Sequence, residues 1–299
     1  MAALTLRGRT FDAAHPAVMA IINRTTDSFY APARHAELDA ALDAMDDAVA
    51  GGADIVDIGA VRAGQEGERV SVRMEVERLT PFLTEARRRH PEVILSVDTW
   101  RSEVVRAVVP LDVDLVNDTW AGHDAALARE AAAAGLGLVC SHTGGLPPRT
   151  DPVSVTYPPE PDGVVADVVR RLGAAAQAAL DAGIPRDRIL LDPTLDFGKT
   201  TRHSLTLVRR TADVVALGFP VLQAISRKDF VGETLDLPAD ERLHGTLAAT
   251  AVAAWLGATV FRTHDVRATR QTVDMVASIL GARPPSLAVR GEPAEEEES

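Results

Sequence analysis

Two residue types are nearly missing from this 299-residue chain. The single cysteine, Cys140, excludes a disulfide framework and a zinc site built from several cysteines, and it is typical of a reducing cytoplasm. Lysine occurs only twice, as Lys199 and Lys228, although the chain has 31 basic residues. Lysine differs from arginine in its compact charge and its three rotatable donors. The two lysine positions are therefore supporting evidence for where a functional site lies.

The chain also lacks an excess of basic charge. Its 31 lysines and arginines stand against 43 aspartates and glutamates, which gives a formal net charge of −12. Binding of nucleic acid or of an anionic membrane needs a basic face, so neither partner is expected. Five glutamates lie within residues 292–299. Such a run is typical of a solvated tail, so we expect one folded domain in residues 1–284 and a disordered segment in residues 285–299.

Long apolar segments are missing as well. Residues 1–12 carry charges and contain no apolar core of a signal peptide. Two stretches free of Asp, Glu, Lys and Arg, residues 131–148 and 243–261, approach the length of a membrane span. Both contain a histidine and at least two glycines, and the second splits at Gly257 into a predicted helix and a predicted strand. We therefore expect a cytoplasmic protein without a membrane segment.

Short apolar runs alternate with longer alanine-rich segments along the chain. Continuous apolar runs predict strands buried on both faces, and apolar residues at three- and four-residue spacing predict helices. Eight strand–helix pairs predict an α/β protein with a single (β/α)8 TIM barrel. The alternative is a doubly wound open sheet, but no G-x-G-x-x-G follows the first run. The expected strands are residues 18–23, 54–59, 93–98, 114–118, 136–142, 189–192, 221–226 and 259–264. The expected helices are residues 36–50, 71–89, 102–109, 124–134, 162–182, 205–217, 241–256 and 268–280.

Polar side chains stand at the end of every predicted strand. Because the active site of such a barrel lies at the carboxyl ends of its strands, these groups are expected to meet at one rim. Asp98, Asn117 and Asp192 end three of the strands and offer acceptors and an amide. This set suits a flat heterocycle with an amidine-like edge, such as a 2-amino-4-oxo pyrimidine ring. Any one of these groups taken alone would be an ordinary polar strand end.

A cationic group follows the last two predicted strands. Lys228, Arg262 and His264 come from neighbouring strands. The loops after strands 7 and 8 form a common phosphate site in barrels, so an anion is expected here.

Seven motifs in order resemble the dihydropteroate synthase family. Residues 19–29, MAIINRTTDSF, are similar to the family's opening M-G-I-[IL]-N-V-T-P-D-S-F, and residues 52–59, GADIVDIG, to G-A-D-I-I-D-I-G. Further matches are Ser96–Thr99, Asn117–Asp118, LDPxxxFGK at 191–199, SRK at 226–228 and RxHDV at 262–266. The resemblance spans roughly residues 18–280.

The resemblance implies a transferase that joins hydroxymethyl-dihydropterin pyrophosphate to p-aminobenzoate and releases pyrophosphate. It implies that Asp98, Asn117, Asp192 and Lys228 bind the pterin, and that Asn23, Arg262 and His264 hold the pyrophosphate with Mg²⁺, Asn23 touching the metal. Asp98, Lys228, Arg262 and His264 would be the catalytic residues, and Phe197 would flank the arylamine. The family also implies a homodimer.

Three loops depart from the family pattern. The motif G-G-E-S-T-R-P-G is replaced by residues 59–66, GAVRAGQE, in which Arg62 is a displaced substitute for the family's arginine. Asp229 stands where the family has a serine that faces the benzoate carboxylate, and Asp196 replaces a glycine. Two carboxylates ~4 Å apart repel each other by roughly 4 kcal/mol at an effective dielectric of about 20. The second-substrate pocket of Phe197, Asp229 and Arg62 is therefore expected to differ from the family's.

These departures leave three functions open. The first is a synthase-type transferase in the folate pathway, acting on p-aminobenzoate or on a different amine. The second is a catalytically weak or inactive pterin-binding paralogue that serves as a binding or interaction protein. The third is a pterin-binding methyltransferase domain, which the retained anion site of Lys228, Arg262 and His264 argues against.

Overall fold

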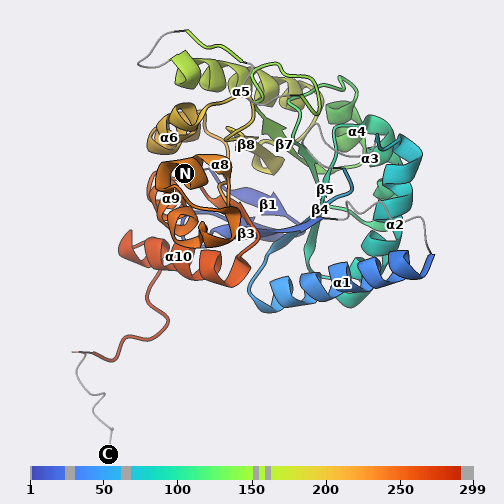
Figure 1. The fold of residues 1–299 in the computed structure, drawn as a ribbon, viewed down its shortest axis with the longest axis horizontal. Helices are drawn as coiled ribbons and strands as arrows, with labels where there is room; N and C mark the ends of the chain where they lie inside the picture. The colour runs from blue at the N-terminus through green and yellow to red at the C-terminus, as the bar shows by residue number, and fades with distance from the viewer. Residues whose placement is uncertain (1, 24–30, 62–68, 151–154, 159–162, 291–299) are drawn as a thin grey trace, which may run out of the picture.

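In the computed structural model, which describes residues 2–23, 31–61, 69–150, 155–158 and 163–290, eight parallel strands stand inside a ring of helices (Figure 1). Hydrogen bonds join them in the order β8-β7-β6-β5-β4-β3-β10-β9, and a parallel bridge between Leu191 and Val221 joins the two end strands. The expected TIM barrel is confirmed. The strands are β3 (Ala17–Asn23), β4 (Ile55–Gly59), β5 (Ile94–Asp98), β6 (Leu115–Asp118), β7 (Gly137–Ser141), β8 (Ile189–Asp192), β9 (Leu222–Ala224) and β10 (Val260–Thr263).

Side-chain alternation along each strand separates two apolar cores. One core lies between strands and helices and contains Val18, Ile58 and Val97. The other lies inside the barrel and contains Met19, Ile55 and residues of the same strand parity. Successive residues of a strand point to opposite faces. The polar residues that end the strands have the same parity as these inward apolar residues, so their side chains also point into the barrel.

The outer ring is formed by the helices that follow the strands (Figure 1). Their bounds agree with the expected ones to within a few residues at most ends. They are α1 (Ala31–Ala50), α2 (Val72–Arg89), α3 (Ser102–Val108), α4 (Leu127–Ala133), α5 (Gly163–Asp181), α6 (Thr201–Arg209), α7 (Thr211–Val215), α8 (Asp229–Leu235), α9 (Leu243–Trp255) and α10 (Val266–Ile279).

Three elements differ from the expectation. An antiparallel hairpin of β1 (Leu4–Leu6) and β2 (Arg9–Phe11) precedes the barrel, and its buried apolar residues join the core inside the barrel. Strands of three residues are too short for their alternation to be recognised. The helix expected at 205–217 is two helices, because the backbone of Arg210 leaves helical geometry (ψ 22°). The short helix α8 follows β9 directly and was not expected.

The chain after α10 runs away from the barrel (Figure 1), and residues 285–290 contain no helix or strand. The expected disordered segment thus falls largely on residues 291–299, outside the described part, and the domain boundary stays a prediction. None of the helices in the described part of the chain is long and apolar enough to cross a membrane.

Candidate functional site

Asp57 lies at the centre of a polar cluster inside the barrel. Its side chain is fully buried, and it points inward because it shares the parity of Ile55. Its carboxylate accepts hydrogen bonds from Ser96 Oγ (2.5 Å), Asn117 Nδ2 (2.9 Å) and Arg262 Nε (2.7 Å). The sequence analysis did not include Asp57 among the site residues. Asp57 is a charged residue two positions before the end of an otherwise apolar strand, and this is the signal that could have identified it.

Asp98 ends the neighbouring strand and shares the same arginine. Its carboxylate accepts from Arg262 Nη2 (3.1 Å) and from Thr119 Oγ1 (3.1 Å). Burial raises the pKa of Asp98 to about 7, against the opposing attraction of the Arg262 guanidinium, and the nearby Asp57 carboxylate raises it further. Arg262, expected to hold pyrophosphate, is thus engaged by two carboxylates of the barrel interior.

Asn117 and Asp192 complete an acceptor-rich floor. Asn117 donates to Asp57, and its Oδ1 atom is buried and has no hydrogen-bond partner among the residues that the structure describes. The Asp192 carboxylate accepts from the backbone N–H of Thr194 (2.7 Å). Burial raises the pKa of Asp192, while the Lys228 ammonium opposes that rise. An unpaired buried acceptor costs about 1–3 kcal/mol, so a ligand N–H placed here would gain that amount.

The two lysines have different surroundings. Lys199 is buried, and its ammonium donates to the carbonyl oxygens of His142 (2.7 Å), Thr194 (3.0 Å) and Phe197 (2.8 Å). All three of its donors are used inside the protein, so Lys199 fixes the loop after β8 and has none left for a ligand. Burial lowers the pKa of this ammonium.

Lys228 lies at the barrel mouth. Its ammonium donates to the carbonyl oxygen of Leu195 and lies 4.9 Å from the ring centroid of Phe197, a cation–π distance. Burial lowers the pKa of Lys228, and the carboxylates of Asp196 and Asp192 oppose the shift. The structure therefore brings Lys228, Phe197 and Asp192 together.

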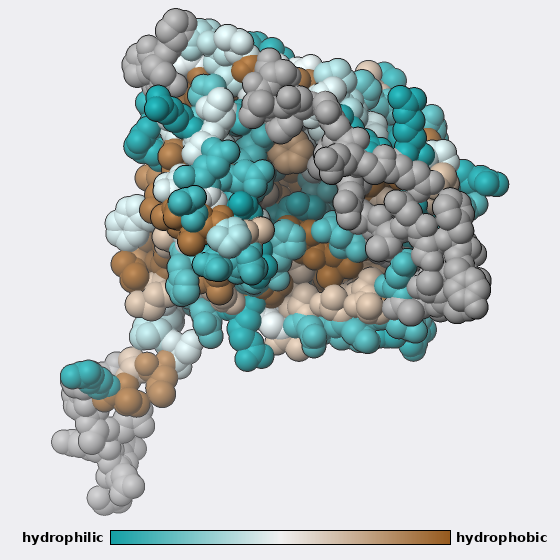
Figure 2. All heavy atoms as spheres, viewed as in Figure 1, coloured by the Kyte–Doolittle hydropathy of each residue, from teal (hydrophilic) through white to brown (hydrophobic). Residues whose placement is uncertain are grey.

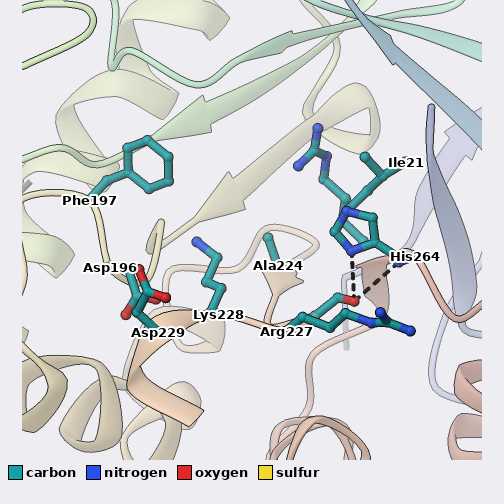
Figure 3. Close-up of a pocket in the computed structure, with 10 residues that line it drawn as sticks. Ile21, Asp196, Phe197, Ala224, Arg227, Lys228, Asp229 and His264 are labelled. Carbon is teal, nitrogen blue, oxygen red and sulfur yellow. Dashed lines mark hydrogen bonds between the residues drawn. The ribbon is translucent and has the colours of Figure 1, made fainter. Parts of the chain in front are cut away.

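A cavity of about 280 Å³ opens at this mouth. Figure 2 shows the hollow, with hydrophilic side chains at its centre. Its lining combines apolar and charged groups, and Figure 3 shows Lys228 between the Asp196–Asp229 side and the His264–Arg227 side. The lining residues are Ile21, Asp196, Phe197, Ala224, Ser226, Arg227, Lys228, Asp229, Arg262 and His264.

The charged groups of this lining already have partners in the described structure. The Arg227 guanidinium bonds both oxygens of Asp265 (3.0 and 2.7 Å). Asp229, 81% exposed, pairs with Arg242 Nη1 at 2.9 Å. His264 Nδ1 lies 3.0 Å from Ser226 Oγ, and burial followed by repulsion from Arg262 lowers the pKa of His264. An anion entering the cavity would therefore find the guanidinium groups of Arg227 and Arg262 already bound to carboxylates.

The magnesium site expected at Asn23 stays a prediction. Asn23 ends β3 and is exposed, and it is the one side chain proposed as a ligand. Asp57 and Asp98 are engaged by Arg262, and the described chain contains no group of three or more His, Cys, Asp or Glu side chains able to hold a metal ion. Arg62, proposed for the second-substrate pocket, lies outside the described residues.

The arrangement is suited to binding a planar, nitrogen-rich ring. Carboxylates and an amide oxygen at the floor accept N–H donors, and Phe197 and Lys228 lie above them at the mouth. Trp120 packs edge-on against Phe197 with ring centroids 5.7 Å apart, and Trp100 packs on Trp120 at 6.4 Å. These contacts hold the Phe197 ring in place.

Comparison with known proteins identifies the family. Residues 19–264 match the family model described as "Pterin binding enzyme". The chain is 33% identical over 280 residues to dihydropteroate synthase of Escherichia coli, covering 94% of this chain and 97% of that protein. A solved dihydropteroate synthase of Coxiella burnetii in complex with pteroic acid superposes with a TM-score of 0.79 at 32% identity, covering 94% of this chain and all of that one.

A more similar relative corrects the expected activity. The chain is 51% identical over 287 residues to a Mycobacterium tuberculosis protein named "Inactive dihydropteroate synthase 2", covering 96% of this chain and 90% of that protein. This finding overturns the expectation of a synthase-type transferase and of an enzyme. It favours the alternative, a pterin-binding paralogue without catalysis. From the family model and these relatives, the chain belongs to the dihydropteroate synthase family of pterin-binding proteins.

Proposed function

We propose that this chain binds a pterin on the floor of its barrel and does not turn it over. The observation that carries the proposal is the acceptor floor of Asp98, Asn117 and Asp192, with Asn117 Oδ1 buried and unpaired. The 2-amino group and ring N–H of a pterin are the donors that this floor lacks. Asp57 and Arg262 belong to the same cluster and hold Asn117 and Asp98 in place.

The engaged cations support binding without catalysis. Release of pyrophosphate needs cations that stabilise the developing negative charge. Arg227 and Arg262 are held by carboxylates, and Lys228 is flanked by Asp196 and Asp229.

A paired assay tests the proposal. The purified chain is titrated with 6-hydroxymethylpterin by isothermal calorimetry, and is separately incubated with the dihydropterin pyrophosphate, p-aminobenzoate and Mg²⁺. We expect saturable binding heat and no enzyme-dependent release of pyrophosphate. A conventional synthase such as the E. coli protein is the positive control. Release of pyrophosphate at a comparable rate would refute the non-catalytic half, and absence of binding heat would refute the pterin half.

We also propose that the chain forms a homodimer through α9 and α10, and that it resides in the cytoplasm. These neighbouring helices expose Val252 and Trp255 on α9 and Met275 and Ile279 on α10, each about half exposed. Large apolar side chains grouped on one face favour burial against a partner. Sedimentation should give a dimer for the natural chain and a monomer for Trp255→Arg. A monomer at high protein concentration would refute the dimer.

A further inference from the structure

The cavity beside the proposed pterin floor carries two carboxylates on one wall. Asp196 comes from the loop after β8, and Asp229 is the first residue of α8. Both lie next to the Lys228 ammonium and across the cavity from Arg227 and His264 (Figure 3).

Both carboxylates are held in place. Asp196 Oδ1 accepts from Ser204 Oγ (3.0 Å), and Asp196 Oδ2 accepts from the backbone N–H of Phe230 (3.3 Å). Asp229 Oδ1 accepts from Arg242, whose guanidinium also donates to the carbonyl oxygens of Leu237 and Arg227. These contacts fix both side chains at the wall, and the Arg242 guanidinium offsets part of the charge of Asp229.

The charges around the cavity leave no surplus cation. Seven carboxylates face five side-chain cations among the described residues that line the cavity or act on its lysines and arginines. Each lysine and arginine already donates to a carboxylate or a carbonyl oxygen. The carboxylates are Asp57, Asp98, Asp192, Asp196, Asp229, Asp240 and Asp265, and the cations are Lys199, Arg227, Lys228, Arg242 and Arg262.

We propose that this cavity accepts a pterin whose side chain ends in a cationic or N–H-donating group, and that it rejects one that ends in a carboxylate. The inference rests on the proposed function, because it takes the pterin ring to lie on the adjacent floor. An ammonium placed here meets the free lone pairs of Asp196 and Asp229. A carboxylate placed here meets two like charges, and the guanidinium groups of Arg227 and Arg262 already bond carboxylates.

Three probes that differ only in the 6-substituent test the proposal: 6-aminomethylpterin, 6-hydroxymethylpterin and 6-carboxypterin. Calorimetry should rank their affinities in that order, with the cationic probe bound at least about tenfold more tightly than the anionic one. The ratio should shrink as salt rises from about 0.05 M to about 0.5 M, because salt screens charges near the surface.

Neutralising the wall should remove the preference. The affinity for 6-aminomethylpterin divided by that for 6-carboxypterin should fall in Asp229→Asn. It should fall further, to about threefold or less, in the double variant that combines Asp196→Asn and Asp229→Asn. The matched control is Asp236→Asn, which removes the same charge at the other end of α8, outside the cavity lining, at a left-handed position (φ 55°) that asparagine tolerates. The control should keep the full ratio.

The outcomes separate the two proposals. Equal affinities, or tighter binding of the anionic probe, would overturn the charge preference while leaving pterin binding in place. A preference unchanged in Asp229→Asn and in the double variant would overturn the assignment to these carboxylates. Absence of binding by all three probes would overturn the proposed function and this inference with it.

Discussion

Burial of Asp98 inside the barrel makes the stability of the fold depend on pH. Burial raises the pKa of this carboxyl from 3.8 to about 7. Between these values the folded state binds a proton that the unfolded chain releases, so the contribution of Asp98 to stability falls as pH rises through that interval. A full shift of about 3 pKa units corresponds to about 4 kcal/mol. The side chain keeps 21% of its surface exposed, so we expect a smaller part, about 2–3 kcal/mol.

Asp98→Asn removes this titration while keeping an oxygen that accepts from Arg262. Urea unfolding at about pH 5 and about pH 8 measures the free energy of unfolding of both proteins. We expect the variant to improve relative to the natural chain by about 1–2 kcal/mol between the two values of pH, because this interval covers only the upper part of the range from 3.8 to about 7. Asp112→Asn is a control that should show no change between these two values of pH, because a hydrogen bond from Arg7 lowers the pKa of that surface carboxyl below 3.8 and the group is ionised in both states throughout the interval. If Asp98→Asn differs from the natural chain by the same free energy of unfolding at both values of pH, the reasoning is refuted.

Three further substitutions test the loop after β8, each by denaturant unfolding. Lys199→Met removes the donor to three carbonyl oxygens, of which that of Thr194 still accepts from the Phe197 N–H, and should cost about 3–5 kcal/mol; a loss below 1 kcal/mol would contradict the role given to its ammonium. Gly198→Ala should cost about 1–3 kcal/mol, since its φ is +63° and a Cβ would meet the Thr143 carbonyl oxygen at 2.3 Å; an unchanged midpoint would contradict this packing. Thr200→Ala removes the capping box with His203 and should cost about 1 kcal/mol, whereas Thr200→Ser should cost less.

Much of the barrel could be predicted because its signal is local. Apolar runs such as residues 189–192 coincide with β8, and the polar residue that ends each run marks the rim. The site residues Asp98, Asn117 and Asp192 follow from that rule, whereas their partners do not. Arg262 pairs with Asp57 across 205 residues of sequence, and only the closed barrel brings them together.

Two side chains show where reasoning from sequence neighbours falls short. Asp229 follows Lys228 directly and was interpreted as an unpaired repulsive charge. In the structure α8 begins at Asp229 and brings it to Arg242, which lies after that helix. Lys199 is one of only two lysines and lies in a family motif, which pointed to a functional role. In the structure its ammonium donates to three backbone carbonyl groups. For Asp229 the deciding contact lies outside the motif; for Lys199 it combines His142 with Thr194 and Phe197 of the motif itself.

The central claim is that the acceptor floor binds a pterin, and one calorimetric comparison tests it most directly. 6-Hydroxymethylpterin is titrated into the natural chain, into Asp192→Asn and into the surface control Asp236→Asn. The amide in Asp192→Asn replaces one acceptor of ring N–H groups by a donor, which should cost about 2–3 kcal/mol, or about 30- to 150-fold in affinity. We expect that loss in Asp192→Asn alone. Equal affinity in all three proteins, or no binding by the natural chain, would contradict it.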